Sequence, residues 1–316
     1  MAMSNSFWRG VCWTSAAVAG LLALSVSTAG AQNCGLKLLA SYPMREDPIG
    51  RLVIPLTVEG SQRNMIVDTG GFVSLMSTDA VDAAKLPKFA MSGTVYSTRG
   101  RITTYTKANV AIGALHGDAM QFLVADAFPG WKQQSIAGTL GPNILTRFDV
   151  DFDFGGKKLN ILLQDHCPGQ VVYWSKAYAV LSFPLDDNGH IELPVTLDGK
   201  EMKALIDTGA TGSVLNASTA RDTFGLTASG SQSASGDAYV ATLHTLTIGS
   251  IAVQNPRFYV APDKIGRDMQ SDEAMSGYIG VKQKPSMIIG NDILRQLHFY
   301  IAYAERKIYV TAADAH

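Results

Sequence analysis

Two copies of one short pattern constrain this chain more than any other feature. The stretches Met65–Gly71 and Ala204–Ala210 each run through apolar residues into Asp-Thr-Gly and then into small residues. Neighbouring landmarks repeat at one constant spacing: Gly50 with Gly189, Pro55 with Pro194, Gly60 with Gly199, and Asp68 with Asp207. A single Asp-Thr-Gly is a common turn sequence. Two copies in matching surroundings indicate an internal duplication.

Each repeat opens with two short runs that are rich in β-branched and apolar residues. A turn with glycine, at Gly60 or Gly199, joins the two runs, and this arrangement predicts a β-hairpin. Helical periodicity is rare along the chain, so we expect an all-β architecture. The length of 316 residues is sufficient for two domains, each with its own core.

A second repeated unit closes each half of the chain. It reads Gly141-Pro-Asn143-Ile-Leu in the first half and Gly290-Asn-Asp292-Ile-Leu in the second. These two copies lie farther apart than the two aspartates do, so the second repeat carries an insertion, near 263–276. The stretch 164–179 between the repeats has no clear period. We therefore predict an N-terminal domain over residues 32–170 and a C-terminal domain over residues 171–316.

A polar, glycine-containing region follows each Asp-Thr-Gly. Gly100 and Gly236 occupy equivalent places in these two regions. Hairpins of this composition are typical of mobile flaps, because few apolar contacts hold them. An ordinary surface hairpin is the alternative.

Residues 1–31 are predicted to form a signal peptide. Arg9 is their only charged residue, an apolar run follows it, and Ala29-Gly30-Ala31 supplies small residues for cleavage. An N-terminal membrane anchor is the alternative, and no second apolar span follows. The remaining chain holds Cys34 and Cys167, for which a periplasmic or secreted location predicts a disulfide, with two unpaired thiols as the other possibility.

The two repeated units together resemble the retropepsin-like aspartic peptidases. Ile66-Val67-Asp68-Thr69-Gly70 and Leu205-Ile206-Asp207-Thr208-Gly209 are similar to the catalytic loops of that family. The units at Gly141 and Gly290 are similar to its glycine motif, with Asn143 and Asp292 in equivalent places. The resemblance implies two closed β-barrel domains related by a pseudo-twofold axis, with an active site between them.

It also implies that Asp68 and Asp207 share a proton and activate water for peptide hydrolysis, one acting as general base and one as general acid. Pairs of carboxylates that share one proton are known from aspartic proteases in general. Thr69, Gly70, Thr208 and Gly209 would support the pair, and no metal or organic cofactor is needed. The partner would be a peptide or protein substrate, bound by a monomer that acts as an internal pseudo-dimer. A catalytically idle peptide-binding or scaffold protein and a homodimer are the alternatives.

Other function classes find little support in the sequence. The 26 Lys and Arg residues balance 27 Asp and Glu, with no basic stripe of the kind that binds nucleic acid. The histidines show no metal-ligand spacing. Asp149, Asp151 and Asp153 alternate with apolar residues, which predicts a half-buried strand with the aspartates on its outer face; the alternative, a calcium loop, lacks the required Gly and Glu.

Overall fold

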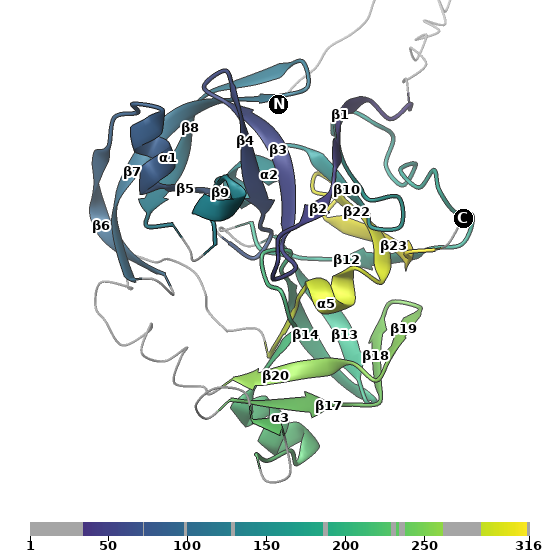
Figure 1. Ribbon diagram of the computed structural model, residues 1–316. Coiled ribbons are helices and arrows are strands. Elements are labelled where there is room, and N and C mark those ends of the chain that lie inside the picture. The colour runs from purple at the N-terminus through teal and green to yellow at the C-terminus, as the bar shows by residue number, and fades with distance from the viewer. Residues whose placement is uncertain are drawn as a thin grey trace, which may run out of the picture. The chain divides into compact units, whose positions relative to one another are not determined.

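The computed structural model describes residues 34–71, 73–97, 100–127, 130–185, 189–228, 232–233, 238–261 and 286–314. Three β-sheets and a few short helices make up this part of the chain, which confirms the expected all-β class (Figure 1). No helix within these ranges is long and apolar enough to cross a membrane. The predicted signal peptide, Gly236 and the extra stretch 263–276 lie outside the described residues.

The first repeat forms an eight-stranded sheet that closes into a barrel. Its strand order is β2-β3-β4-β9-β5-β8-β7-β6, and an additional pairing joins β3 to β7. The strands are β2 (Arg45–Glu46), β3 (Leu52–Val58), β4 (Ser61–Val67), β5 (Leu75–Ser77), β6 (Phe89–Ser97), β7 (Gly100–Ile112), β8 (Leu115–Ala125) and β9 (Ile136–Leu140). The helices are α1 (Thr78–Ala83), the 3₁₀ turn η1 (Lys132–Gln134) and α2 (Pro142–Leu145).

The second repeat forms a nine-stranded sheet of the same plan. Its order is β16-β17-β20-β15-β21-β14-β13-β18-β19. The strands are β13 (Glu192–Leu197), β14 (Lys200–Ile206), β15 (Val214–Asn216), β16 (Gln232–Ser233), β17 (Tyr239–Thr242), β18 (Thr245–Ile248), β19 (Ile251–Gln254), β20 (Arg257–Ala261) and β21 (Met287–Ile289). The helices are α3 (Ala217–Phe224) and α5 (Asn291–Leu294).

The sheet of the second repeat differs from that of the first in the continuity of its strands. The long strands β7 and β8 correspond to the successive pairs β17–β18 and β19–β20. Pro256 separates β19 from β20, and proline cannot donate a hydrogen bond to a strand ladder. The strand conformation is also interrupted between β17 and β18, so two short strands take the place of one long strand.

The opening hairpins of the two repeats use the same turn. Glu59 and Gly60 join β3 to β4 with φ of 49° and 69°, and Asp198 and Gly199 join β13 to β14 with φ of 45° and 75°. Positive φ at both central residues defines the turn that best matches the twist of a hairpin. The predicted β-hairpins are therefore confirmed in both repeats.

A third, six-stranded sheet contains strands from both repeats. Its order is β1-β11-β10-β22-β23-β12, with antiparallel neighbours throughout. The strands are β1 (Leu38–Pro43), β10 (Asp149–Asp153), β11 (Lys158–Leu162), β12 (Ala179–Ser182), β22 (Leu297–Ala302) and β23 (Lys307–Ala312). In its middle Asp151 lies opposite Tyr300, its equivalent in the second repeat, so this pair marks the pseudo-twofold axis. Because the sheet joins both repeats, the domain boundary near residue 170 stays a prediction.

One face of this shared sheet corrects the expectation of a half-buried strand. Asp149 and Asp151 of β10 are fully buried. Asp149 Oδ2 lies 2.6 Å from Nε2 of His166 and 3.0 Å from the hydroxyl of Tyr300, and Asp151 Oδ1 lies 2.8 Å from Nε2 of His298. The alternation was misleading because the chain between the repeats, which includes His166, covers this face and shields the aspartates from water.

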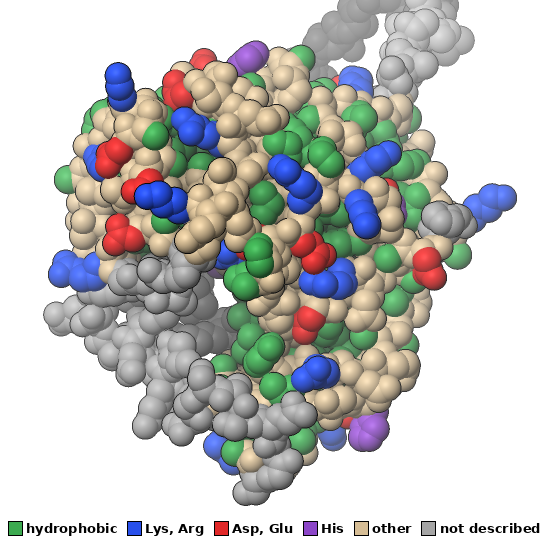
Figure 2. All heavy atoms as spheres, in the orientation of Figure 1, with side chains coloured by type: hydrophobic (Ala, Val, Ile, Leu, Met, Phe, Trp, Pro, Cys, Tyr) green, Lys and Arg blue, Asp and Glu red, His purple; other side chains and the backbone are tan. Residues whose placement is uncertain are grey.

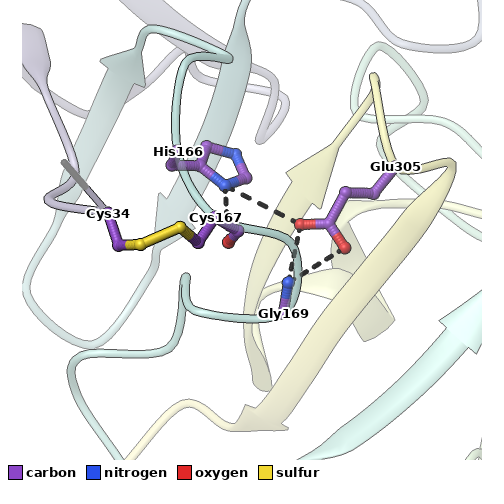
Figure 3. The surroundings of a disulfide bond; sticks show 5 residues. All are labelled: Cys34, His166, Cys167, Gly169 and Glu305. Carbon is purple, nitrogen blue, oxygen red and sulfur yellow. Dashed lines mark hydrogen bonds and ion pairs between the residues drawn. A yellow bond between two sulfur atoms is a disulfide. The ribbon is translucent and has the colours of Figure 1, made fainter. Parts of the chain in front are cut away.

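The predicted disulfide between Cys34 and Cys167 is confirmed, with the two Cα atoms 4.7 Å apart (Figure 3). It joins the residues before β1 to the chain between the repeats. The residues on either side of Cys167 contact the turn between β22 and β23. Gly169 donates its N–H to both carboxylate oxygens of Glu305, at 3.0 and 3.2 Å, and Nδ1 of His166 lies 3.8 Å from Glu305 Oε1. The disulfide and Glu305 therefore fix the connecting chain at two points.

Candidate active site

Asp68 and Asp207 each follow directly after the buried end of a central strand. Asp68 comes after β4 and donates its N–H to the carbonyl of Leu140 at 3.0 Å, and Asp207 comes after β14 and donates to the carbonyl of Ile289 at 3.0 Å. The acceptors belong to the parallel neighbours β9 and β21. Each repeat thus holds its aspartate at the end of a parallel strand pair.

The threonines that follow the aspartates bind one another across the two repeats. Thr69 donates its N–H to Oγ1 of Thr208 at 3.1 Å, and Thr208 donates its N–H to Oγ1 of Thr69 at the same distance. The hydroxyls then donate across the pseudo-axis, Thr69 to the carbonyl of Ile206 and Thr208 to that of Val67, both at 2.8 Å. These four buried bonds hold the two loops in one relative position.

The glycines of the two triplets allow each loop to approach the opposite carboxylate. A Cβ on Gly70 would lie 2.2 Å from Cγ of Asp207. A Cβ on Gly209 would lie 2.5 Å from Oδ1 of Asp68 and 3.2 Å from Oδ1 of Asp207. Because one such point is close to both carboxylates, the aspartates face each other, and only glycine fits beside them.

Backbone N–H groups bind the two carboxylates. Gly71 donates to Oδ1 of Asp68 at 2.7 Å, and Gly209 and Ala210 donate to Oδ1 of Asp207 at 2.8 and 3.1 Å. Hydrogen bonds of this kind stabilise the ionised form of a carboxylate. They favour the negative charge that a general base requires.

Burial and mutual repulsion act against that ionisation. Burial and then the negative charge of Asp68 raise the pKa of Asp207 to about 7. Burial also raises the pKa of Asp68, although N–H groups of Gly71 and Gly70 oppose the rise. Two facing carboxylates in such surroundings titrate as a pair.

The glycine motifs lie directly beneath the loops. Gly141 donates its N–H to Oγ of Ser74 at 2.9 Å, and that hydroxyl donates to Oδ1 of Asn143 at 2.8 Å. In the second repeat Gly290 donates to Oγ of Ser213 at 3.0 Å, and that hydroxyl donates to Oδ1 of Asp292 at 2.7 Å. The structure therefore connects each predicted motif to its loop through a serine.

Ser74 and Ser213 are site residues that the sequence interpretation missed. Their spacing along the chain equals that of the two aspartates, and both are fully buried. This spacing was a usable signal. Serine is too common in turns for its position alone to have attracted attention.

Arg51 and His190 form a second missed pair at the spacing of the two aspartates. They lie just before β3 and β13, and their electrostatic interactions with Asp68 lower the pKa of that carboxyl. Arg51 also forms an ion pair with the buried Asp47, with 2.6 Å between Nη2 and Oδ2. Arg51 thus brings a positive charge near Asp68 from the first repeat.

Of the two predicted flap residues, the structure describes Gly100. Gly100 is the first residue of β7 and lies opposite Ser97 in the β6–β7 hairpin. Farther along this hairpin Val95 and Ile102 are buried against Leu123. Gly236 lies outside the described residues, and a flap role for Gly100 and Gly236 stays a prediction.

Metal-ligating side chains do not gather in the described part of this site. Within the described ranges no three His, Cys, Asp or Glu residues are arranged so that they could hold a metal ion. The chemistry that this geometry offers is proton transfer by two facing carboxylates.

Comparison with known proteins supports the duplicated arrangement. A family model described as "Aspartyl protease" matches residues 54–144 and 193–293, one match in each repeat and together more than half of the chain. The crystal structure of the aspartic proteinase from Irpex lacteus superposes with a TM-score of 0.53, covering 87% of this chain and 97% of that chain. With 12% identity, this likeness concerns the fold. A search of the curated proteins gave no match.

Proposed function

Because the chain belongs to the aspartyl protease family, we propose that it is an aspartic endopeptidase in which Asp68 and Asp207 activate the water that hydrolyses a peptide bond. One observation carries this proposal: the two carboxylates face each other across the pseudo-axis, with Gly70 and Gly209 leaving them room. Four threonine hydrogen bonds keep the two loops in register. A chain could match the family by sequence without holding its two carboxylates in this geometry.

The proposed reaction uses the single proton that the pair holds. The ionised carboxylate takes a proton from water while the water oxygen bonds to the carbonyl carbon, and the protonated carboxylate donates its proton to the carbonyl oxygen. Collapse of the tetrahedral gem-diol breaks the C–N bond as the amine nitrogen takes a proton from one carboxyl group and a hydroxyl of the intermediate returns a proton to the other. The carboxylates return to their starting charge, and no other reactant is required.

Cleavage of a mixed peptide library by purified protein, from about pH 3 to about pH 9, tests this proposal. We expect kcat/KM to fall about tenfold per pH unit above about pH 7, as Asp207 and its partner lose the shared proton. Asp68→Asn and Asp207→Asn should each lower activity by about 10³-fold or more.

Two other outcomes would contradict the proposal. Activity that survives either substitution would exclude the shared-proton mechanism. A folded parent that cleaves nothing at any pH would indicate a peptide-binding protein instead. Circular dichroism and thermal unfolding of each variant serve as the control for folding.

We further propose that the protein acts as a periplasmic or secreted monomer, after removal of residues 1–31. A disulfide between Cys34 and Cys167 suits an oxidising compartment, because thiols stay reduced in the cytosol. Both aspartates belong to one chain, so a second copy is not needed for the pair. Light scattering of secreted material should give the mass of one chain, and N-terminal sequencing should begin at Gln32.

A further inference from the structure

One asparagine joins the loop that carries Asp207 to the first repeat. Asn291 is the first residue of α5 and is 1% exposed. Its side-chain Nδ2 donates to the carbonyl of Thr208 at 2.8 Å and to the carbonyl of Gly50 at 3.2 Å. Its backbone N–H donates to the carbonyl of Ala210 at 2.9 Å. Asn291 therefore binds the loop of the second repeat at two points and the first repeat at one.

The bond to Thr208 acts on a peptide group that binds one of the two facing carboxylates. The carbonyl of Thr208 and the N–H of Gly209 belong to the same peptide group, and that N–H donates to Oδ1 of Asp207 at 2.8 Å. A donor at the carbonyl end of a peptide group polarises the group and makes its N–H a stronger donor. The chain of hydrogen bonds that starts at Asn291 therefore stabilises the negative charge of Asp207 and fixes the direction of the N–H that binds it.

The bond to Gly50 has the same form in the first repeat. The carbonyl of Gly50 and the N–H of Arg51 belong to one peptide group, and that N–H donates to Oδ1 of the buried Asp47 at 2.9 Å. Asp47 also forms the ion pair that holds Arg51, and the charge of Arg51 lowers the pKa of Asp68. One amide group thus supports both the peptide group that binds Asp207 and the segment that carries Arg51.

A proline stands at the equivalent place in the first repeat. It is Pro142, which has neither a backbone N–H nor a polar side chain with which to bind the loop after Asp68. Pro142 packs closely against Gly189, where an added Cβ would lie 2.7 Å from the Cβ of the proline. The hydrogen bonds of Asn291 are therefore an addition to the second repeat, which the pseudo-symmetry of the fold does not require.

Asn291 is neutral at every pH, but the groups around it carry charge. The charged and titratable side chains near the two aspartates and α5 are Asp47, Arg51, His190, Asp292, Arg295 and Glu46. Figure 2 shows acidic and basic side chains close together over the surface around α5. Because the asparagine itself does not titrate, replacing it changes how these groups act on the aspartates without removing a charge.

We propose that Asn291 is a positioning residue of the active site, which holds the peptide group between Thr208 and Gly209 and the segment of Arg51 where they stabilise the ionised aspartates. The inference rests on the proposed peptidase activity and adds a residue to its machinery. Without Asn291 the pair would keep its shared proton to higher pH, because removing one donor from a chain of hydrogen bonds weakens the next bond.

The pH profile of Asn291→Ala on the best library substrate tests the proposal. We expect kcat/KM of the parent to fall above about pH 7. The midpoint of that fall should lie about 0.5 to 1 pH unit higher in the variant, which is the effect of losing one hydrogen bond. Asn291→Pro copies the first repeat, should move the midpoint in the same direction, and replaces the alanine variant if that one does not fold. A purely structural role would lower the rate evenly at every pH and leave the midpoint in place.

Asn64→Ala is the matched control. Nδ2 of Asn64 also donates to a backbone carbonyl, that of Gln134 at 3.1 Å. Asn64 is separated from Asp68 by an extended strand, a distance of about 13 Å along the chain. Its replacement should leave the midpoint of the parent unchanged. A midpoint that both Asn291 variants share with the parent, or an equal shift in Asn64→Ala, would overturn the positioning role and leave the peptidase intact.

Urea unfolding gives a second measurement that needs no substrate. The urea midpoint of Asn291→Ala should fall below that of the parent at about pH 5, and should fall by more at about pH 9, where both aspartates are ionised and lack the support of the amide. Asn64→Ala should lower the urea midpoint equally at both pH values. If the parent cleaves no peptide, the peptidase proposal fails, and the larger loss at high pH would still uphold the role of Asn291. An equal loss at both pH values would overturn that role.

Discussion

The two repeats agree closely beneath the aspartates and differ a few residues away, beside Leu123 of the first repeat and Tyr259 of the second. The threonine bonds have matching lengths in both directions, 3.1 Å from each N–H and 2.8 Å from each hydroxyl. The serine bridges to the glycine motifs also match, at 2.9 and 3.0 Å from the glycine N–H and at 2.8 and 2.7 Å from the hydroxyl. A few residues away, Val73 and Asn143 of the first repeat have become Gly212 and Asp292 in the second.

This difference has a physical reason. Each threonine is both donor and acceptor for the opposite loop, so a change in one repeat would leave a buried group of the other without its partner. The contacts that Val73 and Asn143 make with Leu123 and Gln121 lie within their own repeat, and their counterparts can change independently. The symmetric part therefore fixes the carboxylate pair, and the residues outside it can differ between the repeats.

The largest expected effect comes from breaking the symmetric part with a single methyl group. Gly70→Ala and Gly209→Ala would each place a Cβ within 2.5 Å of the opposite carboxylate, which has to move. A shift of about 1 Å in a catalytic group costs on the order of a hundredfold in rate. We expect kcat to fall by at least about that factor in both variants, measured on the short library substrate.

The two glycine variants also test the symmetry itself. Their losses should be similar, since each methyl group meets the carboxylate of the other repeat. A normal rate in either variant, with folding verified by its melting curve, would show that the aspartates do not face each other as described.

The symmetric part was also the part that the sequence could predict. The duplication, the two aspartates and the glycine motifs follow from short motifs at constant spacings, and the disulfide follows from the cysteine count. Such local patterns can be recognised in the sequence because the geometry of the site requires a particular residue type at each position, as Gly70 and Gly209 illustrate. Ser74 and Ser213 have the same spacing as the aspartates and could have been found by extending it.

The remaining features depend on contacts between distant segments. His166, His298 and Tyr300 contact the aspartates of β10 from other parts of the chain, and no local sequence pattern predicts these contacts. Alternation along β10 gave the strand and its apolar face correctly, but the covering of its other face depends on the chain between the repeats. The sequence also does not predict a groove beside Tyr259 in the second repeat, because the groove lies where Gly212 and Asp292 leave space.

A second prediction concerns pH and stability. The folded-state pKa of Asp207 is about 7, above the unfolded value of 3.8, so folding favours its protonated form. This contribution to stability is complete below about pH 3.8 and is lost as pH rises through about 7. Replacing the carboxylate by a neutral amide in Asp207→Asn should therefore raise the free energy of unfolding above pH 7, by on the order of a few kcal/mol, with little effect near pH 4.

Urea unfolding of parent and variant at about pH 4 and about pH 8 measures this difference. Asp222→Asn is the matched control, because Asp222 is exposed on α3 and pairs with its neighbour Arg221. The control should follow the parent at both pH values. An Asp207→Asn protein that loses stability at pH 8 would show that the carboxylate is stabilising there, contrary to its raised pKa.

The smallest expected effects come from exchanging the residues at which the repeats differ. Asn143→Asp removes the donor to the carbonyl of Gln121 and should cost about 1 kcal/mol, because this bond is near the surface. Asp292→Asn supplies a donor opposite the strand residue Arg257 and should gain up to about 1 kcal/mol if the bond of the first repeat forms in the second. Urea unfolding measures both changes in the free energy of unfolding. If they have opposite signs and add in the double variant, one hydrogen bond sets the difference between the two repeats at this place. If Asn143→Asp is neutral, the Asn143 bond contributes little, and the groove results from Gly212 in place of Val73.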